Sequence, residues 1–189
     1  MIKKFYTIQS KEAYENALSK GFLSCPISFV DESDRESYTW LYSIYAMKYN
    51  IIDSEYSLIW LWKNELPDYY YEKDDDSSEI YIYERLGENN LLLEIELEEE
   101  DVLMSNFTAW HVPLNNISFI SKEETIREES GGFLLTKYNW GRLFDREWLI
   151  ENEYIYPEDT LEQGVVPTIQ VSKISNVFSK STVENLIHP

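Results

Sequence analysis

The chain is poor in cysteine and histidine, and both shortages exclude classes of site. Cys25 is the only cysteine among 189 residues, so no disulfide can form within the chain. This cysteine usage is typical of a reducing compartment, and we expect a cytoplasmic protein. His111 and His188 are the two histidines, and neither has a second histidine or a cysteine at the spacing that zinc sites need. We therefore expect no metal site.

Long apolar runs and phosphate-binding glycine loops are also missing. No stretch reaches the ~18 consecutive apolar residues of a membrane-spanning helix, and the basic start MIKKFYTIQS lacks the apolar run of a signal peptide. The pair Gly131 and Gly132 lies in a polar stretch without the strand and the lysine of a phosphate-binding loop. No Gly-x-Ser-x-Gly motif accompanies His111, so we interpret it as a structural histidine. The sequence predicts no membrane contact.

Basic residues are few relative to acids. The chain has 16 Lys and Arg residues and 35 Asp and Glu residues, which gives a formal net charge of −19. That charge repels phosphates, so direct nucleic-acid binding is not expected. Two interpretations of the acidic residues stay open. They form a solvated surface, or they form a face that blocks a basic nucleic-acid-binding groove on a partner protein in a phage or host-defence setting. Carboxylate pairs are too abundant to identify a glycosidase.

Apolar and aromatic residues are plentiful, and their pattern predicts helices as well as strands. Hydrophobic residues make up 43% and aromatic residues 15%, enough for a core in one domain over 1–189. Residues 2–8 predict a strand, followed by a helix that Ser10 caps and Gly21 ends. Ser33 and Glu36 have the spacing of a capping box, before a helix with an aromatic stripe that runs to about Asn50.

The rest of the chain predicts more strands than helices. SLIWLWK (57–63) alternates as a strand with Trp60 and Trp62 on one face. EIYIYER (79–85) and NLLLEIELE (90–98) predict a hairpin after an acidic loop over 69–79. We expect an irregular segment over 101–116, a polar helix or loop over 121–132, a helix near 140–148 and two short strands over 164–179 that turn near Ser172. The prediction is an α+β domain with a mixed, mostly antiparallel β core flanked by helices.

Several motifs along the chain resemble one bacterial family of unknown function. The specific stretches are the Tyr-Thr-Ile-Gln opening at 6–9, the Ile-Trp-x-Trp strand at 59–62 and the following Pro67 and Asp68. A third is the Asp-Val-Leu-x-Ser-x-Phe-x-x-Trp-His run at 101–111. In this order they resemble the family catalogued as DUF3841 over nearly the whole chain. The family name implies no reaction.

A more distant resemblance does imply chemistry. The polar positions of the first strand, the Gly-Phe-Leu-Ser that closes the first helix, the tryptophan strand and the late Glu-Gln-Gly-Val-Val-Pro at 162–167 are similar to the ADP-ribosyltransferase superfamily. The resemblance implies NAD as the cofactor. A His or Arg on the first strand would hold it, an aromatic side chain would stack on nicotinamide, and a late Glu would stabilise the charge that develops on the ribose.

Carried onto this chain, the superfamily positions fall on five residues. Thr7 and Gln9 occupy the NAD-holding strand, Trp60 or Trp62 supplies the stacking ring, and Glu162 is the late acid. Thr7 departs from the His or Arg of the superfamily and carries no charge. The sequence therefore leaves open an active enzyme, a decayed enzyme that retains an NAD-binding cleft, and a non-enzymatic acidic protein that binds a basic partner.

Overall fold

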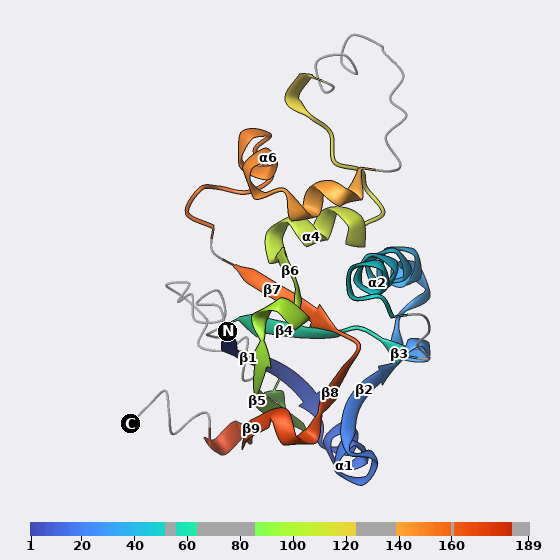
Figure 1. Ribbon diagram of the computed structural model, residues 1–189, viewed down its shortest axis with the longest axis vertical. Coiled ribbons are helices and arrows are strands. Elements are labelled where there is room, and N and C mark those ends of the chain that lie inside the picture. Colours follow the sequence, from blue (N-terminus) through green and yellow to red (C-terminus); the bar gives the residue numbers. More distant parts are fainter. Residues whose placement is uncertain (52–55, 64–85, 124–138, 160, 183–189) are drawn as a thin grey trace.

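The computed structural model describes residues 1–51, 56–63, 86–123, 139–159 and 161–182 (Figure 1). The acidic loop predicted over 69–79 and the strand predicted over 79–85 lie outside the described residues. Most of the polar segment predicted over 121–132 lies outside them as well.

The chain opens with a β–α unit whose boundaries follow from two residues. Strand β1 (Ile2–Ser10) leads directly into helix α1 (Lys11–Lys20). The Ser10 hydroxyl accepts a hydrogen bond from the backbone N–H of Ala13, and Gly21 ends the helix with a left-handed φ of 86°. Both the predicted cap and the predicted stop are confirmed, because a side-chain acceptor and a residue free of Cβ meet the needs of the two helix ends.

A six-stranded antiparallel sheet forms the centre of the molecule. Its order is β6-β7-β4-β1-β5-β9, with β4 (Ile59–Lys63), β5 (Asn90–Glu98), β6 (Leu103–Asn106), β7 (Glu162–Val166) and β9 (Ile174–Phe178). Strand β1 pairs with β5 along its whole length, but it pairs with β4 only at Phe5 and Tyr6. Beyond Tyr6 the two strands separate, so the sheet is split between β1 and β4.

A second sheet lies at the split. It has three strands in the order β3-β2-β8, with β3 (Tyr56–Ser57), β2 (Phe22–Pro26) and β8 (Thr168–Gln170). Strand β3 comes just before β4 and β8 just after β7, so two segments pass from the large sheet into the small one. Pro167, which has no N–H to donate, stands at the second of these crossings.

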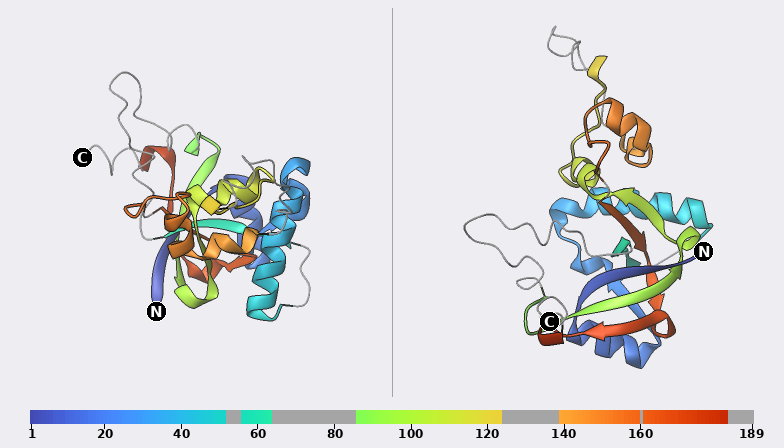
Figure 2. Two further views of the ribbon diagram at one scale, coloured as in Figure 1. Left: turned by 90° about the horizontal axis from the view of Figure 1, so that it is seen from above. Right: turned by 90° about the vertical axis from the view of Figure 1, so that its left-hand side faces the viewer.

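Besides α1, the structure describes three further α-helices. Helix α2 (Arg35–Tyr49) packs Leu41 and Tyr45 into the core, α4 (Phe107–Leu114) follows β6, and α6 (Arg146–Glu151) follows the 3-10 turn Trp140–Phe144. Helices α4 and α6 lie toward one end of the molecule and α1 toward the other (Figures 1 and 2). The core between sheet and helices includes fully buried Phe5, Leu61, Leu93 and Ile95.

The structure corrects three local predictions. Helix α2 follows Asp34 without a side-chain cap, and the Ser33 hydroxyl donates to the Asp34 carboxylate instead of capping the helix. The segment 101–116 is not irregular over most of its length, since β6 and α4 occupy residues 103–114 and the Asn106 side chain accepts from Ala109 N–H. The tail contains three short strands instead of two, because the chain changes sheet at Pro167 and turns again over Val171–Lys173.

The predicted fold class is confirmed: the protein is a mixed α+β structure with a mostly antiparallel sheet flanked by helices. Over the described ranges, no helix is long and apolar enough to cross a membrane. Within the same ranges, no group of three or more His, Cys, Asp and Glu side chains is arranged to hold a metal ion.

Candidate ligand-binding cleft

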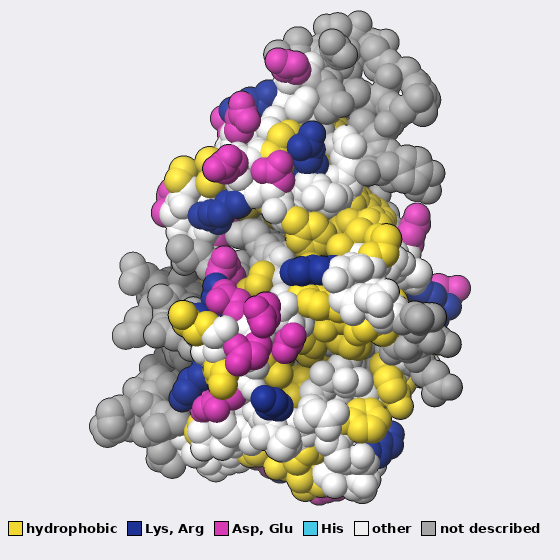
Figure 3. Space-filling view, in the orientation of Figure 1, with side chains coloured by type: hydrophobic (Ala, Val, Ile, Leu, Met, Phe, Trp, Pro, Cys, Tyr) yellow, Lys and Arg dark blue, Asp and Glu magenta, His cyan; other side chains and the backbone are white. Residues whose placement is uncertain are grey.

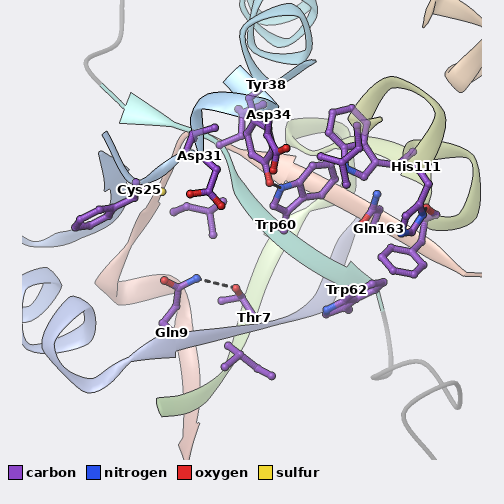
Figure 4. A pocket seen from close by; sticks show the side chains of 18 residues that line it. Thr7, Gln9, Cys25, Asp31, Asp34, Tyr38, Trp60, Trp62, His111 and Gln163 are labelled. Atoms are coloured by element: carbon purple, nitrogen blue, oxygen red, sulfur yellow. Dashed lines mark hydrogen bonds between the residues drawn. The ribbon is translucent and has the colours of Figure 1, made fainter. Parts of the chain in front are cut away.

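A cleft of about 680 Å³ opens where β1 and β4 separate (Figure 4). Thr7 and Gln9 line it from β1, and Trp60 and Trp62 line it from β4. Alternation along a strand explains each pair, since residues two apart point to the same face. The structure thus brings together four of the five site residues that the sequence predicts, although Thr7 and Gln9 come more than fifty residues before Trp60 and Trp62 in the chain.

Glu162, the fifth predicted residue, does not line this cleft. Its carboxylate lies 2.7 Å from the ammonium of Lys63, and its side chain is 48% exposed. The next residue, Gln163, lines the cleft instead. Successive side chains of a strand point to opposite faces. Glu162 therefore points away from the cleft, and the uncharged amide of Gln163 points into it.

Gln163 is the most unusual polar residue of the cleft. The residue is only 3% exposed, and its Nε2 amide has no hydrogen-bond partner among the described residues. Strand β7 holds the residue in place, because Gln163 pairs with Trp62 of β4 and with Ser105 of β6. A buried donor without a partner costs about 1–3 kcal/mol. Such a group in a cleft is a donor that a bound acceptor would satisfy.

Thr7 and Gln9 form a small polar patch on the opposite side of the cleft. The Gln9 Nε2 donates to the Thr7 hydroxyl at 2.9 Å, and Thr7 is buried at 3% exposure. In Figure 4 this pair lies below β4, across the cleft from Asp31 and Asp34. The patch offers hydrogen bonds but no charge, in contrast to the His or Arg that the superfamily resemblance implies.

Three aromatic rings form one wall. Tyr38 of α2 contacts Trp60 edge-to-face with ring centroids 6.0 Å apart, and Trp110 of α4 lies 4.9 Å from Trp60. The Trp60 indole N–H donates to the Tyr38 hydroxyl at 2.8 Å. Burial raises the pKa of Tyr38, although this bond from Trp60 opposes the rise. The contacts fix the Trp60 ring against α2 and α4, so it is a rigid surface for a flat ligand.

The far end of the cleft is also aromatic. Trp62 lies 4.9 Å from Phe107, and Phe107 lies 4.9 Å from the His111 ring. His111 Nδ1 is 3.1 Å from the Phe107 carbonyl oxygen, within one turn of α4. His111 thus has a structural contact inside its helix and lines the cleft as well.

The segment between β2 and α2 forms the mouth of the cleft. Phe29 lines it although the side chain is 77% exposed, and Asp31 and Asp34 line it from the same segment. Cys25 of β2 lies at this end too, and burial raises the pKa of its thiol. Sequence reasoning missed Asp31 and Asp34, because residues between strands and helices follow no period and acids are abundant. It missed Gln163 because the register of β7 depends on pairing with distant strands. The signal available for Gln163 was that side chains alternate between the two faces of a strand, so Gln163 and Glu162 point to opposite faces of β7.

A family model described as Domain of unknown function (DUF3841) matches residues 4–130. The match covers about two thirds of the chain and includes the Tyr-Thr-Ile-Gln, Ile-Trp-x-Trp and Trp-His motifs. The chain belongs to the DUF3841 family. No curated protein and no solved structure matches it.

The DUF3841 match contains most of the cleft. Thr7, Gln9, Trp60 and Trp62 fall within the matched residues, whereas Glu162 and Gln163 come later in the chain. The family description states no activity, so the chemistry of the DUF3841 cleft has to be argued from its own side chains.

Proposed function

We propose that this DUF3841 protein binds a planar nitrogen heterocycle in the cleft between β1 and β4. The observation that carries the proposal is Gln163, a buried amide donor without a partner that faces an aromatic-lined cavity. Ligand sites of this size combine apolar walls with a few fixed polar groups, and the cleft has both.

The nicotinamide ring of NAD is the first member of this ligand class to test. The resemblance to ADP-ribosyltransferases implies it, and the carboxamide oxygen of nicotinamide is an acceptor of the kind that Gln163 lacks. Trp60 is the ring on which the heterocycle would stack, with Trp62 further along the same strand face. Thr7 and Gln9 would add hydrogen bonds from the other wall.

The proposal includes binding but no transfer step. Glu162, the acid expected to stabilise charge on the ribose, forms an ion pair with Lys63 outside the cleft. Gln163 lines the cleft and has no negative charge to offer a developing cation. A ligand-binding domain that resembles transferases without their acid is the function that this geometry supports best.

A titration with two tryptophan variants tests the proposal. We expect nicotinamide, its 1-methyl cation or NAD to quench tryptophan fluorescence saturably below about 10 mM, a range typical of weak small-molecule sites. Trp60→Phe keeps an aromatic ring of smaller area and should weaken that binding about 3- to 10-fold, the size of a stacking contribution.

Trp148→Phe is the matched control. Trp148 stacks on Tyr154 with ring centroids 5.7 Å apart and does not line the cleft. We expect this variant to bind as the wild type does. Absence of saturable binding for all three compounds, or equal weakening by both variants, would reject the cleft as the binding site.

A further inference from the structure

The charges of the cleft are all of one sign. Among its described lining residues, Asp31 and Asp34 are the acids, and no Lys or Arg lines it. Neither aspartate forms an ion pair within the described part of the chain. The Asp34 carboxylate accepts a hydrogen bond from the Ser33 hydroxyl at 2.9 Å. Two carboxylates therefore face the cleft without an ion-pair partner among the described residues.

Both carboxylates lie close to the aromatic wall. Besides burial, the charges of Asp34 and Asp31 help to raise the pKa of Tyr38, whose hydroxyl accepts from Trp60. Figure 4 shows the two aspartates beside Tyr38 and Trp60, with Thr7 and Gln9 across the cleft from them. Asp34 is half-buried and Asp31 is exposed at the mouth. A cation at this position would contact carboxylates and aromatic rings together, and each attracts positive charge.

The opposite end of the cleft has a different polarity. Figure 4 shows Gln163 beyond Trp60 toward His111, away from the two aspartates. Its unpartnered amide N–H requires an acceptor and gains nothing from a cation. The cleft is thus polarised, with acids at the mouth, aromatic rings between, and a buried donor at the inner end.

We propose that the ligand of this cleft is a cationic heterocycle that carries a carbonyl acceptor. Its positive charge lies at Asp31 and Asp34, its ring lies against Trp60, and its carbonyl oxygen accepts from Gln163. The inference rests on the proposed function, since it names the ligand class of the same cleft.

The same polarity disfavours an intact dinucleotide. The diphosphate of NAD carries negative charge, which needs Lys, Arg or free backbone N–H groups around it. The N-terminus of α2 supplies about half a positive charge, but Asp34 itself stands at that terminus. The cleft should therefore bind the nicotinamide ring as a small cation more tightly than it binds NAD.

Three probes of graded charge test the inference on the full chain. The probes are 1-methylnicotinamide, a cation, nicotinamide, which is neutral with the same carboxamide, and NAD. At low salt we expect 1-methylnicotinamide to bind at least 5-fold more tightly than the other two. We expect added salt to reduce this preference, because screening weakens exposed charge interactions.

Charge-neutral variants locate the effect. The double variant Asp31→Asn, Asp34→Asn should abolish the preference for 1-methylnicotinamide over nicotinamide. The control is Glu32→Gln, an exposed acid of the same segment that does not line the cleft, and it should retain the full preference. Thermal unfolding of each variant verifies that the fold is intact.

The outcomes separate the two proposals. Binding of none of the probes rejects the proposed function and the inference together. Binding of nicotinamide or NAD as tightly as 1-methylnicotinamide supports a ligand site and overturns the inference alone. A preference for the cation that survives in the double variant overturns the assignment to Asp31 and Asp34.

Discussion

Glu94 shows how a single buried carboxylate stabilises this fold. The side chain is 8% exposed and accepts from the Tyr6 hydroxyl at 2.9 Å, the Ser175 hydroxyl at 2.9 Å and the Asn176 amide at 2.8 Å. The Lys4 ammonium lies 3.1 Å away. Burial by itself would raise the pKa of Glu94, but these four donors hold the pKa at about 2. The charged form thus ties β5 to both neighbouring strands.

This geometry predicts a specific acid sensitivity. The folded pKa of about 2 lies below the ordinary value of 4.5, so Glu94 contributes stability above about pH 5 that is lost as the pH falls toward 2. We expect Glu94→Gln to lower the free energy of unfolding by about 2 kcal/mol at pH 7. Urea unfolding between pH 7 and pH 3 measures both effects.

Glu96→Gln is the matched control for Glu94. Glu96 lies on the same strand and is exposed, and we expect its substitution to change stability by less than about 0.5 kcal/mol. Equal stability losses for the two variants, or an unchanged pH dependence in Glu94→Gln, would refute the assigned role of Glu94.

At the scale of elements, β7 fits between β4 and β6 because of one glycine. Gly164 pairs with Leu61 and Met104. A Cβ atom at this position would overlap the Val102 side chain and approach the Met104 sulfur at 2.8 Å. Gly164→Ala should therefore destabilise the protein by about 1–3 kcal/mol, the usual cost of overpacking. Gly141→Ala, where an added Cβ meets nothing within 4 Å, should change stability far less, and chemical denaturation compares the two.

The elements also explain which predictions from sequence succeeded. Ser10 and Gly21 fix the ends of α1 by local chemistry, so the sequence alone located them. Helix α4 was missed because apolar residues occupy nearly all its faces and Pro113 stands near its end, which obscures the helical period. Its start was visible in Asn106, whose side chain caps the helix at Ala109.

Part of the cleft was predictable from the sequence. The superfamily resemblance proposed Thr7, Gln9, Trp60 and Trp62. Each pair lies on one face of a strand that the sequence pattern predicted, and all four line the cleft. Gln163 required the register of β7, which depends on pairing with distant strands. An error of one residue in this register exchanges Glu162 for Gln163, and so changes the predicted cleft residue from an acid to an amide.

At the scale of the whole molecule, some acidic side chains form ion pairs within the fold and others are exposed at the surface. On the face that Figure 3 shows, several Asp and Glu side chains lie together, with Lys and Arg side chains beside them. Part of the charge is neutralised within the fold, since Lys63 pairs with Glu99 and Glu162, each at 2.7 Å, and the N-terminal amine pairs with Glu98 at 2.6 Å. That this surface blocks a basic groove on a partner stays a prediction, beside the ligand cleft on which the proposed function rests.

The most direct test of the cleft replaces Gln163 by a side chain of similar length without a donor. Gln163→Met removes a buried group that has no partner in the free protein, so the free energy of unfolding should stay equal or rise by up to about 1 kcal/mol. Affinity for the probe that binds best should fall at least 5-fold, because the ligand loses its donor. The control Gln170→Met changes an exposed glutamine of β8 outside the cleft and should alter neither quantity. Retained affinity in Gln163→Met, together with a loss of stability, would contradict a ligand-binding role and make Gln163 a purely structural residue.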